Sequence, residues 1–192
     1  MGELLRAVDG YRGEAATAAA HKLAPSPSCA PGELRGAEWR EFYLEGAEWR
    51  IPGERMKMGD AHIVPLPSQA VEILTGLQAV TGNGRYLFPS LRSRERPMSE
   101  NTLNAALRRL GYSTDEMTAH GFRAMASTLL NEQGFPPDGI ELQLAHTEHN
   151  KVRAAYNRAQ RLEERRKMMQ AWADYLDGLR ADAKVVPIRR KA

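Results

Sequence analysis

Residues 119–133, which read AHGFRAMASTLLNEQ, decide the fold because their apolar side chains recur at the spacing of an amphipathic helix. The apolar stripe consists of Phe122, Met125, Ala126, Leu129 and Leu130. At about 100° per residue, His120 and Arg123 project from the flank of this stripe, roughly 60° apart. Such a pair can contact the same small anion, since arginine offers a planar fork of donors and histidine a donor or a base. Taken alone, H-x-x-R is also typical of a solvated helix face.

Helical spacing dominates the rest of the second half. It predicts helices over residues 68–80, 103–110 and 162–179. The turn signals that separate the predicted helices are Gly82-Asn83-Gly84, Gly111, Gly134 and Pro136-Pro137.

The first half mixes helices with short strands. Helices are predicted over 3–9 and 14–23, with a helical turn over 31–36. Strands are predicted over 38–44, 48–51 and 62–66, with a hairpin turn at Glu45-Gly46 and a polar turn at 57–60. The expected fold class is therefore mainly α with a small three-stranded antiparallel β-sheet.

Composition excludes several other classes. The chain has 192 residues, of which 42% are hydrophobic and 27% charged, as in an ordinary globular protein. It contains no run of 18 apolar residues, so no membrane partner is expected. Its single cysteine, Cys29, excludes an internal disulfide and a Cys-rich zinc module, and makes a reducing intracellular setting the default.

Charge permits a polyanionic partner without demonstrating one. The net charge is +3 and the sequence pI is near 9.1. Two basic clusters stand out, and each can equally be a solvated surface. They are Arg85, Arg92, Arg94 and Arg96 in one loop region, and Arg189, Arg190 and Lys191 at the end of the chain.

Further polar residues follow one another in an order that is specific as a set. Lys57 lies in the turn between two predicted strands, and His146 and Tyr156 follow the H-x-x-R helix. The stretches around these residues are Gly32-Glu33-Leu34-Arg35, Arg55-Met56-Lys57-Met58, the segment 120–127, Leu142-Gln143-Leu144-Ala145-His146 and the segment 150–158. Together they resemble the tyrosine recombinase (phage integrase) family, in its prophage-integrase branch, over about residues 4–180.

The resemblance implies the fold of the recombinase catalytic domain and a role for each matching residue. Tyr156 is similar to the nucleophile that attacks a DNA phosphodiester, forming a 3′-phosphotyrosyl link from which strands are rejoined without ATP. Lys57 resembles the general acid for the leaving 5′-oxygen, and His120 the residue that assists proton transfer at the nucleophile. Arg123 and His146 resemble the donors to the non-bridging oxygens. The family's chemistry uses no metal ion and no cofactor.

Simpler interpretations stand beside these roles. Tyr156 can be a core aromatic residue, and Lys57 a plain turn lysine. His146 and His149 form an H-x-x-H pair for which no third ligand is indicated. An unrelated helical metalloenzyme using these two histidines and His120 is the remaining alternative.

The sequence departs from the family at one catalytic position. Where the family places its first catalytic arginine, this chain has Ala30, preceded by a Pro/Ser-rich stretch rather than an apolar one. Arg35 is not expected to substitute, since five helical residues rotate the side chain by about 140°. The sequence therefore predicts that the chain cleaves DNA poorly or not at all. The alternative is a catalytically inactive DNA-binding remnant of a prophage integrase.

The resemblance also implies a domain organisation and partners. Residues 1–182 are expected to form the catalytic domain and 183–192 a C-terminal tail, with the family's N-terminal DNA-binding domains absent. Double-stranded DNA is the expected partner, and a second copy of the chain, held through the C-terminal segment, is another. The expected location is the bacterial cytoplasm, at the nucleoid when bound to DNA.

Overall fold

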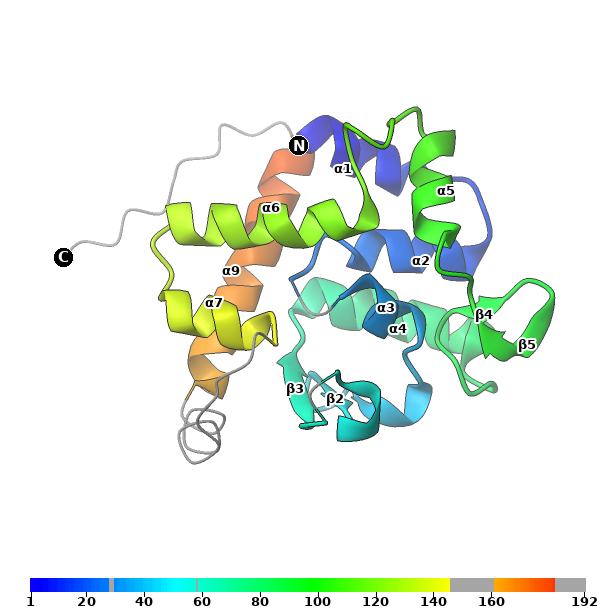
Figure 1. The fold of residues 1–192 in the computed structure, drawn as a ribbon, viewed down its shortest axis with the longest axis horizontal. Helices are drawn as coiled ribbons and strands as arrows, with labels where there is room; N and C mark the ends of the chain where they lie inside the picture. The colour runs from blue at the N-terminus through cyan, green and yellow to red at the C-terminus, as the bar shows by residue number, and fades with distance from the viewer. Residues whose placement is uncertain (28–29, 58, 146–160, 182–192) are drawn as a thin grey trace.

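The computed structural model describes residues 1–27, 30–57, 59–145 and 161–181 (Figure 1). The fold class is as predicted: mainly helical with a three-stranded antiparallel sheet. The α-helices are α1 (Gly2–Asp9), α2 (Ala15–Leu23), α3 (Pro31–Arg35), α4 (Ser68–Thr81), α5 (Thr102–Arg109), α6 (Ala119–Glu132), α7 (Pro137–Gln143) and α9 (Leu162–Arg180). The strands are β1 (Phe42–Tyr43), β2 (Glu48–Ile51), β3 (His62–Pro65), β4 (Pro89–Ser90) and β5 (Ser93–Pro97). Two 3₁₀ turns, η1 (Trp39–Glu41) and η2 (Gly53–Arg55), flank the first two strands.

The sheet has the order β1-β2-β3, with Trp49 of β2 opposite Phe42 on one side and Val64 on the other. The predicted strand over 38–44 is largely wrong, because Trp39–Glu41 forms η1 and only two residues enter the ladder. A contact with a residue of another element explains this difference. The carboxylate of Glu41 is buried, where it accepts a hydrogen bond from the Trp49 indole at 2.9 Å.

Two elements were not predicted. The arginine-rich loop region contains the β4–β5 hairpin, and α7 begins at the second residue of the Pro136-Pro137 pair. The sequence of β5, Ser-Arg-Glu-Arg-Pro, lacks the apolar alternation that marks a strand, and α7 is too short for a helical period to be recognised.

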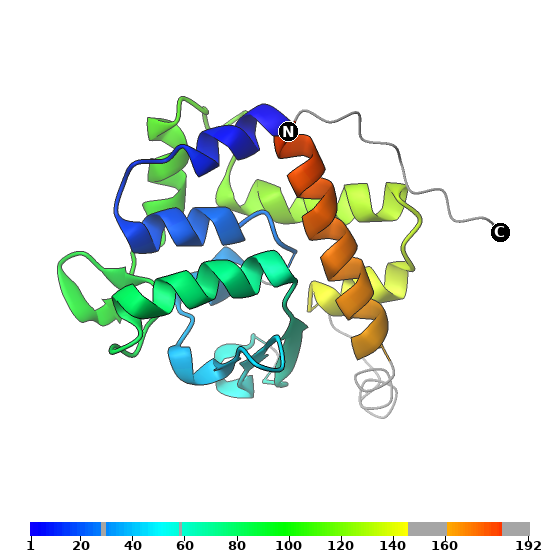
Figure 2. The same cartoon turned by 180° about the vertical axis from the view of Figure 1, so that it is seen from behind.

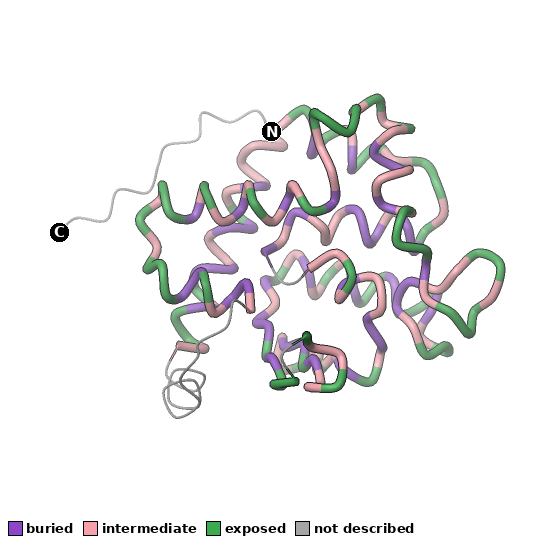
Figure 3. Tube along the Cα trace, viewed as in Figure 1, coloured by how far each residue is buried: buried purple, intermediate pink, exposed green. Residues whose placement is uncertain are grey.

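The core has two main parts. One lies between the sheet, α2 and α4, and includes Trp49, Val64, Leu74 and Phe88. The other joins α1, α6, α7 and α9, where α9 crosses behind α6 (Figures 1 and 2). Buried positions recur along the inner sides of these helices (Figure 3). This packing fixes α6, and with it the H-x-x-R pair, against the C-terminal helix.

No helix within the described ranges combines the length and the apolar character needed to span a bilayer.

Candidate functional site

Helix α6 presents the H-x-x-R pair as the sequence predicts. The Thr118 hydroxyl caps the helix by accepting the Gly121 N–H at 3.0 Å. Phe122 is buried, whereas His120 is exposed and Arg123 is half-buried on the flank. The first turn of α6 thus carries two polar side chains outside the apolar stripe.

Arg123 reaches the C-terminal end of α7. Its guanidinium donates a hydrogen bond to the carbonyl oxygen of Leu144, just beyond the last residue of that helix. Ala145 then adopts a left-handed conformation, with φ of 52°, which turns the chain away from the helix axis. Arg123 therefore contacts the backbone two residues before His146, which itself lies outside the described residues.

Lys57 is exposed in the connection between β2 and β3. The ends of this connection approach closely, because a Cβ added at Gly53 would lie 2.2 Å from the Gly59 carbonyl oxygen. Gly59 has φ of 77°, a conformation that favours glycine. Lys57 therefore lies in a connection whose two ends are close together.

Arg55 ties this turn to α3, a role that the sequence argument missed. The Arg55 guanidinium pairs with the buried Glu41 carboxylate and donates a hydrogen bond to the Glu33 carbonyl oxygen at 2.7 Å. The only available signal was its place in the Arg55-Met56-Lys57-Met58 stretch, since its partners are distant in sequence. Through Arg55, the Lys57 turn and the first turn of α3 are held together.

Ala30 is the N-cap residue of α3 and is half-buried. Its backbone N–H donates to the Glu33 carboxylate at 2.7 Å, while its methyl group offers no donor. Pro31 lines the same small cavity as Arg123, so the start of α3 lies near the arginine of α6. This places Ala30 near the H-x-x-R helix.

Arg35 points elsewhere, in agreement with the prediction. Its guanidinium donates to the Met98 carbonyl oxygen at 3.1 Å and pairs with Glu100 at 3.2 Å. Both partners lie between β5 and α5, so Arg35 is engaged away from the N-terminus of α3.

The Pro/Ser-rich stretch before Ala30 is anchored through its backbone. Pro25 and Pro27 are buried. The carbonyl oxygen of Pro25 accepts the Trp172 indole N–H at 3.0 Å, and that of Pro27 accepts the Gln143 amide at 3.3 Å. Helices α9 and α7 thus satisfy polar groups that would otherwise be buried without partners.

Arg165 completes this anchor from α9. It is 1% exposed, and burial lowers the pKa of its guanidinium to about 10. It donates to the Gln143 side chain at 2.8 Å and to the Ile63 carbonyl oxygen at 2.5 Å. The end of α7, β3 and the segment before Ala30 are therefore held by one buried network.

Of the five predicted site residues, the structure describes Lys57, His120 and Arg123. His146 and Tyr156 lie outside the described residues, as does His149 of the metalloenzyme alternative. Among the described residues, no group of three His, Cys, Asp or Glu side chains could hold a metal ion. Helices α3, α6 and α7 all lie on the face turned to the viewer in Figure 1.

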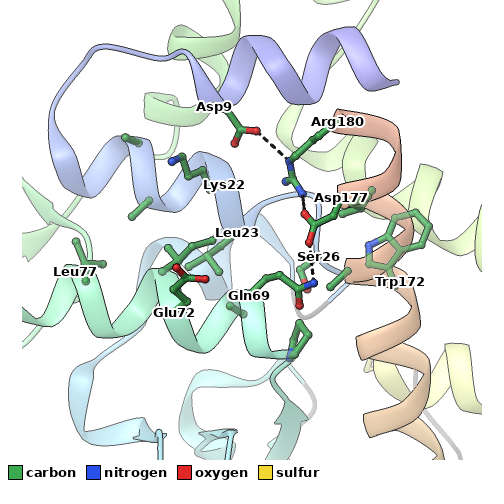
Figure 4. A pocket seen from close by; sticks show the side chains of 18 of the residues that line it. Asp9, Lys22, Leu23, Ser26, Gln69, Glu72, Leu77, Trp172, Asp177 and Arg180 are labelled. Atoms are coloured by element: carbon green, nitrogen blue, oxygen red, sulfur yellow. Dashed lines mark hydrogen bonds and ion pairs between the residues drawn. The ribbon is translucent and has the colours of Figure 1, made fainter. Parts of the chain in front are cut away.

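A separate cavity of about 710 Å³ lies between α2, α4 and α9 (Figure 4). At one end Arg180 pairs with Asp9 at 3.1 Å and with Asp177 at 2.6 Å. Lys57, His120 and Arg123 do not line this cavity, which belongs to the face seen in Figure 2. It is distinct from the candidate site.

A mainly helical domain around a small antiparallel sheet is the fold of phage-integrase catalytic domains. The sequence profile of the Phage integrase family matches residues 3–163, and the chain belongs to this family.

The relatives and the fold agree with this assignment. The chain is 48% identical to prophage integrase IntA of Escherichia coli (strain K12) over 144 residues, which is 75% of this chain and 35% of the relative. It is 45% identical to the integrase of Enterobacteria phage P4 over 190 residues, covering 91% of this chain and 43% of that protein. The fold matches the lambda integrase catalytic core with a TM-score of 0.57 at 20% identity, over 78% of this chain and 91% of that structure. The chain thus spans less than half the length of these curated relatives.

Proposed function

We propose that this chain is the catalytic part of a tyrosine recombinase that cleaves and rejoins double-stranded DNA at specific sites, with cleavage impaired by Ala30. The observation that carries the proposal is the hydrogen bond from Arg123 to the end of α7. It brings Arg123 of α6 to Leu144, a residue that lies two positions before His146 in the sequence and 21 positions after Arg123.

The proposed chemistry assigns one task to each residue. The Tyr156 oxygen attacks the scissile phosphorus and loses its proton with the assistance of His120. The bond to the 5′-oxygen breaks, and that oxygen takes a proton from Lys57. Arg123 and His146 donate hydrogen bonds to the non-bridging oxygens, which gain charge in the transition state. Rejoining runs the same steps in reverse with a 5′-hydroxyl as the nucleophile.

Ala30 removes one donor from this arrangement. Arginine would offer a charged, bidentate clamp for phosphate oxygens, and a methyl group offers none. Loss of one preorganised donor lowers the rate by roughly 10²–10³. Since Arg35 is bound to Met98 and Glu100, no described arginine of α3 replaces it.

The proposal extends to the wider organisation. Residues 1–182 form the catalytic domain and 183–192 a tail, and DNA bound by this domain alone is held weakly and with strong salt dependence. Association with a second copy through the C-terminal segment, and a location on the bacterial nucleoid, are further parts of the proposal.

Restoring the arginine tests the proposal and its alternative. A pool of nicked duplexes, randomised on both sides of the nick, is incubated with the chain, and covalent complexes are counted on a denaturing gel. We expect Ala30→Arg to raise covalent attachment by about 10²–10³ over the wild type. The double variant Ala30→Arg/Tyr156→Phe is the matched control and should form none.

The outcomes separate the candidate functions. Rapid attachment by the wild-type chain would contradict the impairment. If Ala30→Arg binds the duplexes but stays unreactive, the chain acts as a DNA-binding remnant. If neither protein binds DNA, the recombinase proposal fails.

A further inference from the structure

The β4–β5 hairpin carries a basic surface that the proposed chemistry does not use. Its two strands are joined by a tip at Leu91 and Arg92, and it projects from the edge of the molecule in both Figure 1 and Figure 2. Arg92, Arg94 and Arg96 are all exposed. The sequence alone left this cluster open between a solvated surface and a site for a polyanion.

The register of the hairpin places two of these arginines in a bulge. Ser90 pairs with Ser93, and Pro89 pairs with Pro97, so β4 supplies no residue opposite Arg94-Glu95-Arg96. An extra segment of this kind leaves the ladder and redirects its side chains. The three residues of the bulge are exposed accordingly.

The hairpin is nevertheless firmly rooted. Phe88 and Met98 at its base are 0% and 3% exposed, and the Met98 N–H donates to the Phe88 carbonyl oxygen at 2.7 Å. The Ser93 hydroxyl accepts the Glu95 N–H at 3.3 Å within the bulge. A rigid base under exposed guanidinium groups reduces the conformational entropy lost when an anion binds.

The arginines of the hairpin differ from Arg85 in their ion pairing. Arg85 differs, because it pairs with buried Glu38 at 2.7 Å, and this hydrogen bond holds the pKa of that carboxyl below its ordinary value. Among the residues that the structure describes, Arg92, Arg94 and Arg96 have no ion-pair partner. Glu95 offsets one of these three charges, and a net positive hairpin remains.

The hairpin is also connected to the candidate site. Arg35, at the end of α3, donates to the Met98 carbonyl oxygen directly after β5 and pairs with Glu100. Ala30 begins the same short helix. The base of the hairpin is therefore a direct neighbour of α3. A DNA duplex whose scissile phosphate lies at the start of α3 would extend toward it.

We infer that the β4–β5 hairpin is a second DNA contact, in which Arg92, Arg94 and Arg96 bind backbone phosphates of the duplex beside the cleavage position. The inference rests on the proposed function for its ligand. Such contacts position the DNA and carry no sequence information of their own. Each phosphate neutralised releases counterions, so each contact steepens the fall of affinity with salt.

The test compares two variants that each remove two positive charges. Arg94→Gln/Arg96→Gln alters the bulge, and Arg12→Gln/Lys167→Gln alters exposed cations on the α1–α2 connection and on α9. Binding of a labelled 30-base-pair duplex of mixed sequence is measured by fluorescence anisotropy between 50 and 200 mM KCl. Thermal melting of each variant verifies that the fold is retained.

We expect the hairpin variant to bind about tenfold more weakly and to lower the slope of log K against log salt by between one and two. Arg94→Lys/Arg96→Lys should keep most of the slope, because lysine retains the charge. If the hairpin variant and the control pair change affinity and slope equally, the hairpin contact is wrong while the proposed function stands. Absence of duplex binding by the wild-type chain would overturn both.

Discussion

The two segments that meet at the candidate site, residues 25–27 with Ala30 and residues 118–123, are both held by hydrogen bonds but present different side chains. In the first, the carbonyl oxygens of Pro25 and Pro27 are bound by Trp172 and Gln143, yet its last residue presents only a methyl group. In the second, Thr118 caps a regular helix that presents His120 and Arg123. Both segments are held by hydrogen bonds, but Ala30 presents a methyl group whereas His120 and Arg123 present nitrogen donors.

The difference shows that packing constrains a segment through its backbone atoms, whereas phosphate chemistry constrains it through its side chains. The carbonyl oxygens of residues 25 and 27 belong to the backbone and are present whatever side chains these positions carry, so the hydrogen bonds from Trp172 and Gln143 survive a change of sequence there. A phosphate clamp depends on the guanidinium of one arginine side chain, so it is lost when that residue is replaced. A segment can therefore lose its chemistry while the fold around it remains intact.

The largest effect is expected when the hydrogen bond that anchors the first segment is removed. Trp172 is 1% exposed, and its indole supplies the hydrogen bond to Pro25. We expect Trp172→Ala to lower the free energy of unfolding by about 3–5 kcal/mol, through the cavity and the unpaired carbonyl. Urea unfolding measures this loss.

Trp172→Phe is the matched control for that experiment. It keeps an aromatic ring and removes the donor, so a loss of about 1–3 kcal/mol is expected. A cost below about 1 kcal/mol for Trp172→Ala would mean that residues 25–27 are not held as the structure describes.

A smaller loss of unfolding free energy is expected for the second segment, because the substitution there removes only the N-cap hydrogen bond of α6. Thr118→Ala removes the acceptor for the Gly121 N–H and is expected to cost about 1 kcal/mol. Thr118→Ser retains the hydroxyl and should restore most of that loss in the same urea titration. Equal losses for alanine and serine would show that the methyl group, and not the cap, matters here.

Local signals explain which parts of the fold could be predicted. Helix α6 was predicted over 119–133 and spans Ala119–Glu132, because its cap and its apolar period both lie within the segment. The strand over 38–44 failed because Glu41 is drawn into η1 by Trp49 and Arg55, which follow it in other elements. The fold class survived this error, since the pairing of β2 with β3 depends on their own alternation.

The same reasoning applies to the candidate site. Arg123 was identified from its spacing to His120, whereas the hydrogen bond to Leu144 depends on how α7 packs and carries no sequence signal. Arg55 was missed as an anchor because both of its partners lie outside its own turn. The roles of Tyr156 and His146 stay predictions, as both residues lie outside the described part of the chain.

A last expected effect concerns pH and the helix that leads into the first segment. His21 of α2 is fully buried, with Nε2 3.0 Å from the Leu103 carbonyl oxygen and its ring stacked on Tyr11. Burial lowers the pKa of this imidazole, and the hydrogen bond to Leu103 opposes that shift only in part. The folded protein therefore keeps His21 neutral at pH values where the unfolded chain, with a pKa near 6.5, takes up a proton.

The sign of the pH dependence follows from this difference in bound protons. Below about pH 6.5 the unfolded state binds more protons, so the His21 contribution lowers the free energy of unfolding as the pH falls, by at most about 1.4 kcal/mol per pH unit. His21→Gln removes the titrating group, and its deficit relative to wild type should shrink between pH 7.5 and pH 5. Urea titrations at constant ionic strength measure the difference. A deficit that stays constant over this range would assign the acid sensitivity of the fold to groups other than His21, and the anchor of residues 25–27 would then be independent of the protonation of α2.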